Sequence, residues 1–564
     1  MKRLNVILSA VLLGVCGWVI RIYPWLPYSP IRGRYAPGVD FATWYTLQHG
    51  VLPGILPSAT YTSNLTNGTV YLGEFGRVLL NAPLLLVVGK SGLIDSLTFY
   101  AQIPWQGLIL LPSVLVLGVH AMIRTETERV GPRTRVIGYL LTYALTALGF
   151  PSLINSTSNS GFTDYYGFVF VGLVFYSLVR RASTRASRTK FSGLLVLFMG
   201  QILVYHHTTA LFLVLLLFGV YMVQTRIVFR KAIIEPKIVE ASIVVVYVVL
   251  LIAYVAYLSF SFHGYLFSLT SSLGNLAQGI LGSSVVTPLA RIATTNYFTQ
   301  ERALIRSADL GLTIIVLAYI GVAFVKRRAI GLSGFALAGF GLGAGLAGAF
   351  VIGWGGFGAF FIRISALSAV IAILGIGYIL RHAGAIVKRA LVLMSIAVVV
   401  VSPIAYVSSQ AAPQGALRWS EASAIEWTST NVNRDATVMS DSRVASPLIY
   451  YGFTSALGFE DETASPTSQA KLAEAYFELY RPASSDQVVR GICAVEAVSG
   501  TNVKYFVYST YFQDPGTSVI GFLNSYPPAG QNATSMLDNA TTFQKIFDSG
   551  TTMVYGTSDA TRSC

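Results

Sequence analysis

Two aspartates stand where polar segments run into apolar ones, and both can do chemistry there. Asp40 lies in YAPGVDFATWYTLQHG, among aromatic residues and downstream of Arg32 and Arg34. Asp164 lies in GFPSLINSTSNSGFTDYYG, just before an apolar run. Each aspartate can cap a helix. Alternatively, Asp40 serves as a general base, or the two carboxylates share one divalent cation, Mg²⁺ or Mn²⁺, because hard cations take oxygen ligands.

Three basic side chains offer partners for an anion. Arg363 lies in GAFFIRISALSAV, near the end of an apolar run, where a guanidinium either binds a phosphate bidentately or extends to the membrane interface. His206 and His207 are adjacent, so on a helix they point about 100° apart and do not share one metal ion. We expect one histidine to hydrogen-bond a donor phosphate or sugar, and the other to pack or face water.

Glu301 and Arg302, in FTQERALIR, form a further candidate pair. The glutamate is either a site carboxylate on a long loop or the partner of Arg302 or Arg306 in an ion pair.

The composition indicates a polytopic membrane protein. The 564 residues are 54% hydrophobic and 11% charged, and the mean hydropathy is +0.61, whereas soluble domains carry roughly 25% charged residues. The formal net charge is +14, but the basic residues fall in short breaks between apolar runs. We therefore interpret the charge as topological and expect no nucleic acid as a partner.

About eleven apolar segments are long enough to predict membrane-spanning helices. These segments are Leu4–Ile22, Gln102–Ile123, Val136–Phe150, Tyr165–Val179, Phe191–Tyr205, Thr208–Val223, Val239–Phe260, Asp309–Val325, Gly331–Gly353, Phe360–Leu380 and Ala390–Val407.

The basic breaks predict an orientation in the plasma membrane. Their positions, near residues 124–135, 180–190, 226–237, 326–328 and 381–389, place the N-terminus in the cytoplasm and the C-terminal domain outside it. Glycosylation triplets agree with this orientation, because all fall on segments predicted to be external: Asn64, Asn67, Asn155, Asn532 and Asn539. An external domain would also allow Cys493 and Cys564 to form a disulfide.

Two parts are predicted along the chain. Residues 1–407 form the transmembrane part, with long outer loops at 23–101 and 261–308, and long loops are usually functional. Residues 408–564 form a small α/β domain, because runs such as NVKYFVYST and TTMVYGT are typical of strands and KLAEAYFELY is an amphipathic helix. No Walker A loop or strand-linked GxGxxG motif supports binding of ATP or a dinucleotide.

Taken in order, these stretches resemble the GT-C membrane glycosyltransferases, most of all the catalytic subunits of oligosaccharyltransferases. The resemblance implies a catalytic aspartate at Asp40, a metal-binding aspartate at Asp164, a lipid-phosphate contact at Arg363 and a mobile-loop glutamate at Glu301. One motif departs from the family. Oligosaccharyltransferases carry WWDYG to recognise the acceptor, whereas this chain has Ser440-Asp441-Ser442-Arg443 after the corresponding strand.

The resemblance implies transfer of a sugar or oligosaccharide from a polyprenyl-phosphate or -pyrophosphate donor to a protein or glycan acceptor outside the membrane. Two other functions stay open from the sequence. The number of spans and their glycines would suit a transporter or flippase for a lipid-linked substrate. The loose motifs would suit a non-catalytic envelope scaffold of the same fold.

Overall fold

The computed structural model describes two compact units, one helical and one mixed. The described residues are 3–23, 26, 29–32, 104–124, 131–158, 164–183, 185–225, 238–257, 300–325, 331–353, 359–409, 416–441, 444–445, 448, 453, 456–457, 466–513, 519–520, 525–526 and 529–558. The helical unit takes its residues from 1–23, 100–257 and 297–410, and the mixed unit takes the rest.

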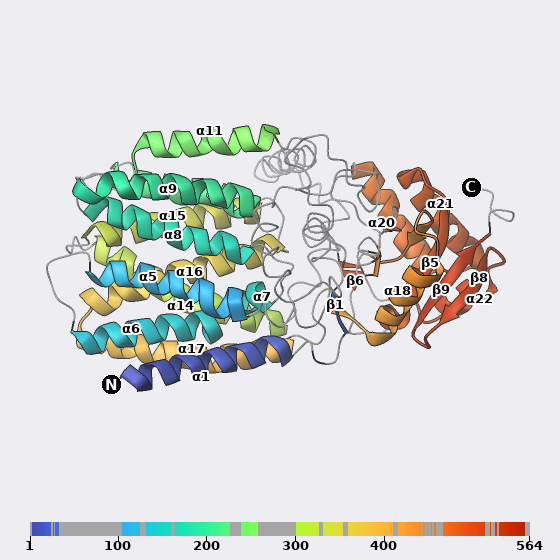
Figure 1. Cartoon of the computed structure of the whole chain (residues 1–564), viewed down its shortest axis with the longest axis horizontal. Helices are drawn as coiled ribbons and strands as arrows, with labels where there is room; N and C mark the ends of the chain where they lie inside the picture. Colours follow the sequence, from blue (N-terminus) through green and yellow to red (C-terminus); the bar gives the residue numbers. More distant parts are fainter. Residues whose placement is uncertain are drawn as a thin grey trace. The chain divides into compact units, whose positions relative to one another are not determined.

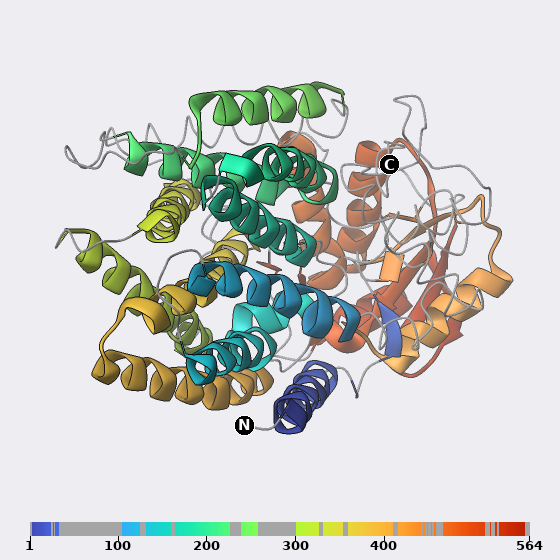
Figure 2. The ribbon, with the colours of Figure 1, turned by 60° about the vertical axis from the view of Figure 1, so that its left-hand side comes forward.

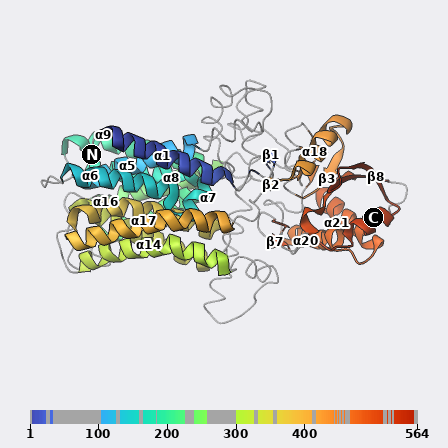
Figure 3. The same ribbon diagram turned by 90° about the horizontal axis from the view of Figure 1, so that it is seen from below.

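The helical unit is a bundle whose helices run alongside one another (Figures 1 and 3). Every segment predicted to span the membrane overlaps a helix in the part of the chain that the structure describes. The elements are α1 (Arg3–Ile22), η2 (Pro104–Leu110), α5 (Leu111–Arg124), α6 (Pro132–Ala144), η3 (Leu145–Gly149), α7 (Pro151–Ser158), α8 (Asp164–Ser183), α9 (Arg185–Tyr205), α10 (His207–Gln224), α11 (Ala241–Tyr257), α14 (Gln300–Val325), α15 (Gly331–Gly353), α16 (Ala359–His382) and α17 (Ala385–Ser409).

Four helices in the described part of the chain are long and apolar enough to cross a membrane: Asn5–Ile22, Gly331–Gly348, Arg363–His382 and Ala385–Val407. Four shorter apolar helices accompany them, at Gly107–Ile123, Thr209–Gln224, Ala241–Tyr254 and Gly311–Ala323. The total of eleven crossings stays a prediction.

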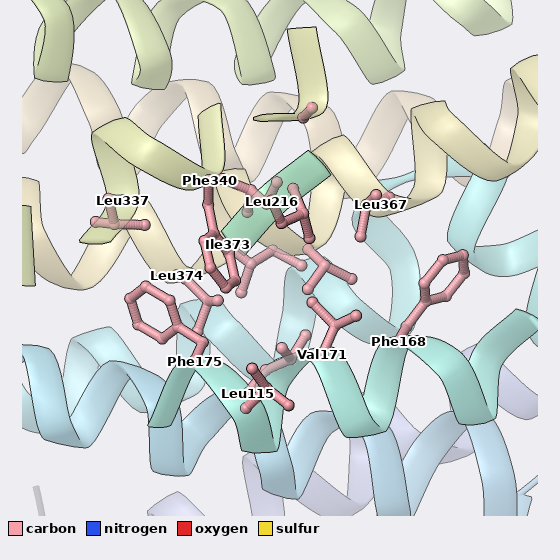
Figure 4. Packing of buried hydrophobic residues seen from close by; sticks show 14 of the residues in the cluster. Leu115, Phe168, Val171, Phe175, Leu216, Leu337, Phe340, Leu367, Ile373 and Leu374 are labelled. Carbon is pink, nitrogen blue, oxygen red and sulfur yellow. The ribbon is translucent and has the colours of Figure 1, made fainter. Parts of the chain in front are cut away.

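Helix α16 forms the centre of the bundle. Of its apolar stretch 94% is buried, against 17% for α1 and 28% for α17. Around it, Phe175 of α8 meets Phe340 of α15 edge-on at 5.3 Å between ring centroids, and Ile373 of α16 belongs to the same cluster (Figure 4). Helix α11, green in Figures 1 and 2, lies at the edge and packs against α9 and α10.

Helices α10 and α15 cross in direct backbone contact. A Cβ atom on Gly343 would lie 2.5 Å from the carbonyl oxygen of Leu215, and one on Gly219 would lie 2.3 Å from that of Gly339. Only glycine fits at such positions, so the small residues of α15 serve the close helix packing that their composition predicts.

The mixed unit contains a five-stranded sheet in the order β4-β3-β5-β9-β8. Strand β3 is parallel to β4 and β5, while β9 is antiparallel to β5 and β8. The strands are β3 (Thr437–Met439), β4 (Ala456–Leu457), β5 (Val503–Ser509), β8 (Phe543–Asp548) and β9 (Thr552–Thr557). The accompanying helices are α18 (Trp419–Asn431), α20 (Pro466–Tyr480), α21 (Ser485–Ser499), η4 (Thr510–Gln513) and α22 (Ala533–Asn539).

Two small sheets complete this unit. Strand β1 (Ser29–Arg32) pairs antiparallel with β2 (Ala416–Leu417), and β6 (Val519–Ile520) pairs with β7 (Ser525–Tyr526). The strands predicted at NVKYFVYST and TTMVYGT are β5 and β9, and the predicted amphipathic helix is residues 471–480 of α20. An α/β C-terminal part is thereby confirmed.

Candidate functional site

Most of the described candidate residues in the helical unit lie at one end of the bundle. Successive helices alternate in direction, so the first turns of α8, α10, α14 and α16 share an end with the last turns of α1 and α17 (Figure 1). We call it the site end and define it by residues 17–22, 145–158, 164–167, 205–210, 300–302, 359–363 and 402–409. The short helix α7 packs there against α8, α14, α16 and α17.

The opposite end of the bundle, which we call the basic end, comprises residues 122–124, 180–183, 185–192, 224–225, 238–240 and 381–388. There Arg181 and Arg188 both pair with Glu240, and Arg381 donates to the carbonyl oxygen of Met122 at 3.2 Å. Burial alone would raise the pKa of Glu240, but the hydrogen bonds and positive charges of the two arginines lower it. The charges at this end therefore join helices to one another.

A fully buried arginine joins α1 to η3 at the site end. Arg21 donates from Nη1 to the carbonyl oxygens of Ala147, at 2.6 Å, and Gly17, at 3.0 Å. A helix continuing past η3 would bond the N–H of residue 151 to a carbonyl near Ala147, but Pro151 has no N–H. The guanidinium supplies the missing donor, and Ser402 of α17 likewise donates to Gly149, at 2.7 Å.

His206 separates α9 from α10 and caps the second helix. Its Nδ1 accepts a hydrogen bond from the backbone N–H of Thr209, at 3.2 Å, and lies 2.6 Å from the Thr209 hydroxyl. Only 1% of His206 is exposed. The sequence predicted this break, because the apolar segments Phe191–Tyr205 and Thr208–Val223 end and begin beside the two histidines.

The first turns of α8 and α10 lie side by side. A Cβ on Gly167 would lie 2.4 Å from the Oγ1 of Thr209, and the rings of Tyr166 and Tyr205 are 5.4 Å apart. Because residues three apart share a helix face, the backbone of Asp164, the first residue of α8, lies on the face that meets α10. Asp164 and His206 are therefore brought to neighbouring helix starts.

The other candidates differ in where the structure places them. Arg363 is half-buried near the start of α16, and His207 is the first residue of α10. Glu301 and Arg302 lie in the first turn of α14, because that helix begins at Gln300, upstream of the predicted start at Asp309. The last residues of the predicted loop, 300–308, are therefore helical, and a role of this pair on a mobile loop stays a prediction.

Several predicted positions lie outside the described residues: Asp40, Asn64, Asn67 and Cys564. Asn155 lies in α7, and Asn532 and Asn539 are exposed at the two ends of α22. Cys493 is disulfide-bonded and Cys16 is a free thiol. The pairing of Cys493 with Cys564, like use of the glycosylation triplets, stays a prediction.

No group of three or more metal-binding side chains gathers within the part of the chain that the structure describes. Of the two predicted ligands, Asp164 stands at a helix start beside His206, and Asp40 is outside that part. Oxygen ligands of this kind suit Mg²⁺ or Mn²⁺.

Comparisons with known proteins bear on the fold. No family model and no curated protein sequence matches the chain. Among solved structures, the Archaeoglobus fulgidus oligosaccharyltransferase in its apo form gives a TM-score of 0.58 at 13% identity, covering 91% of this chain and 70% of its own. The archaeal oligosaccharyltransferase AglB from Archaeoglobus fulgidus, in complex with an inhibitory peptide and a dolichol-phosphate, gives a TM-score of 0.53 at 12% identity, covering 89% of this chain and 69% of its own.

A bacterial structure agrees with the archaeal ones. ArnT from Cupriavidus metallidurans, bound to undecaprenyl phosphate, gives a TM-score of 0.53 at 11% identity and covers 100% of both chains. The chain has the GT-C fold. The resemblance inferred from the sequence is thereby confirmed at the level of the fold, with GT-C proteins from two kinds of organism as its structural neighbours.

Several residues of this GT-C protein were not identified from the sequence. Arg21 was treated as part of the first span, Leu4–Ile22, although a charge at the end of an otherwise uncharged span is a signal for a buried partner. Thr209 and Gly167 carry no motif, and their contact is visible only in three dimensions.

Proposed function

We propose that the protein is a membrane glycosyltransferase that transfers a sugar or oligosaccharide from a polyprenyl-phosphate or -pyrophosphate donor to a protein or glycan acceptor at the outer face of the membrane. One observation carries the proposal. In a GT-C fold, the helix starts that bear Asp164, His206, Glu301 and Arg363 meet at a single end of the bundle.

The donor class is supported by the structural neighbours and by the chemistry of these side chains. The two solved relatives bind a dolichol-phosphate and undecaprenyl phosphate, respectively. A guanidinium at Arg363 and imidazoles at His206 and His207 are suitable donors of hydrogen bonds to a phosphate. The apolar faces of the surrounding helices would accommodate the polyprenyl chain.

Asp40 activates or orients the acceptor in this proposal, as a general base does. Asp40 and Asp164 would also hold a divalent cation, Mg²⁺ or Mn²⁺, which supplies positive charge to a phosphate leaving group. Glu301 and Arg302 flank the reaction from the first turn of α14. The N-terminus would be cytoplasmic and the C-terminal α/β part extracytoplasmic, in the plasma membrane.

The decisive experiment replaces Asp40. We expect Asp40→Ala to abolish transfer from an undecaprenyl-linked sugar in purified protein, while the protein stays folded and in the membrane. Asp435→Ala, at an exposed turn of the mixed unit, is the control and should transfer at the wild-type rate. Transfer that survives Asp40→Ala would contradict the assignment.

A second assay separates the enzyme from a flippase. Sealed vesicles containing the protein should glycosylate an acceptor without moving a labelled lipid-linked sugar between leaflets. Movement of the lipid without transfer would overturn the proposed reaction.

A further inference from the structure

We infer that Thr209 is a positioning residue that fixes His206 as a hydrogen-bond donor through Nε2, the donor that the proposed function assigns to the phosphate of the lipid-linked sugar. The inference rests on the proposed function for the identity of the phosphate. The assignment of the hydrogen to one nitrogen of His206 rests on the geometry at the start of α10.

The backbone decides which nitrogen of His206 carries the hydrogen. The N–H of Thr209 points at Nδ1 from 3.2 Å, and a backbone N–H is always a donor. Nδ1 must therefore be an acceptor, because two hydrogens would otherwise meet. In a neutral imidazole the other nitrogen, Nε2, then bears the hydrogen.

The hydroxyl of Thr209 adds to this constraint. Its oxygen lies 2.6 Å from the same Nδ1, so it donates to the nitrogen alongside the backbone. Thr209 is 1% exposed, and the pair is shielded from water that would compete for Nδ1. Two donors from one residue hold the ring plane, and the ring plane sets the direction of the Nε2–H bond.

Gly167 links the position of Thr209 to the start of α8, where the candidate metal ligand Asp164 lies. Its missing side chain leaves space for Thr209, whose Oγ1, Cβ and Cγ2 atoms would lie 2.4, 2.7 and 2.9 Å from a Cβ at that position. Tyr205, the residue before His206, also packs on Phe170 of α8 at 5.0 Å between ring centroids. The start of α8, where Asp164 stands, and the imidazole of His206 are therefore held in register.

Nitrogen NMR of the ligand-free protein tests the positioning role. The chain has six histidines, so histidine-selective ¹⁵N labelling gives few signals, and His206→Gln identifies the signal of interest. We expect Nε2 to carry the hydrogen and Nδ1 to be unprotonated. Thr209→Val should shift the Nδ1 resonance, while Thr209→Ser should restore it. An Nδ1-protonated ring, or a signal that Thr209→Val leaves unchanged, would overturn the inference.

Binding of undecaprenyl phosphate in detergent micelles tests the role in recognition. Loss of one hydrogen bond corresponds to about a fivefold weaker affinity, so we expect that change for Thr209→Val and wild-type affinity for Thr209→Ser. The double variant with His206→Gln should bind no more weakly than His206→Gln alone, because Thr209 acts through the histidine. An additive loss, or wild-type affinity for Thr209→Val, would contradict a positioning role.

Two glycine variants test the positioning role of Thr209 independently. Gly167→Ala should displace Thr209 and weaken binding, whereas Gly200→Ala in α9, where a Cβ meets nothing within 4 Å, should not. If the wild-type protein fails to bind undecaprenyl phosphate, the proposed function fails, and the NMR result still decides the state of His206.

Discussion

The two ends of the helical bundle hold their buried arginines in different ways. At the basic end, Arg181 pairs with the carboxylate of Glu240 and also donates to Ser192 and Ile238. At the site end, Arg21 donates to main-chain carbonyls of the π-helix η3, at Ala147 and Thr146, and of its own helix, at Gly17. A carboxylate thus serves the architecture at one end, while backbone oxygens do so at the other.

This difference shows how one protein can place cations for structure and for function. Main-chain carbonyls cannot take up a proton or move away, so these hydrogen bonds of Arg21 do not depend on the protonation of an acidic side chain. Three variants test this comparison, in order of decreasing effect.

The largest effect should come from the crossing of α10 with α15. Helix α10 begins at the site end and contacts the backbone of α15 at Gly343, so Gly343→Ala must push the two helices apart. We expect a loss of about 3 kcal/mol or more in the free energy of unfolding, measured by thermal unfolding in detergent. Gly345→Ala, on the same helix with nothing within 4 Å, should be neutral. Equal stability of both variants would contradict the close crossing.

Removal of Arg21 should be the next largest change. Arg21→Met keeps much of the apolar bulk but leaves the Ala147 carbonyl without its buried donor, at a cost of about 2–3 kcal/mol. Arg188→Met at the basic end, where the arginine is 46% exposed, should cost less than about 1 kcal/mol. Thermal unfolding of the two variants measures the difference. The comparison of the ends would be wrong if both variants lost the same stability.

The smallest effect should be at Glu240. Its pKa in the folded protein is below the ordinary 4.5, so its ion pairs stabilise the fold above that pH and lose this contribution as the pH falls through the lowered value. We expect Glu240→Gln to cost about 1 kcal/mol at pH 7 and to make no difference at a pH below the folded-state value. Unfolding curves measured across this range check both points, and a pH-independent deficit would contradict the ion-pair origin.

Much of the fold was predictable because apolar length and composition alone specify helices in a membrane. The break at His206 was visible as a polar interruption of an overlong apolar run, and the strands β5 and β9 as β-branched and aromatic runs. Elements that depend on distant contacts were not predictable. The helix α7 and the π-helix η3 are short, and the carbonyl that Arg21 satisfies lies at Ala147, far along the chain.

The candidate site was predictable in part. Sequence reasoning selected Asp164, His206 and Arg363, and the structure brings their helix starts to one end of the bundle. The sequence reasoning placed Glu301 on a loop, because the polar first turns of α14 lack the apolar pattern of the rest of the helix. The contact of Gly167 with Thr209 could not be found from sequence, since the register between two helices is set by packing.

Helix α16 carries an arginine near each end, Arg363 and Arg381, with an apolar stretch between them that is buried on all sides. A piston-like shift of one turn, about 5.4 Å, would draw one guanidinium into the hydrocarbon-like interior, which is costly. We therefore expect the central helix not to shift along its own axis. Any motion that admits a substrate or releases a product must come from the elements around it.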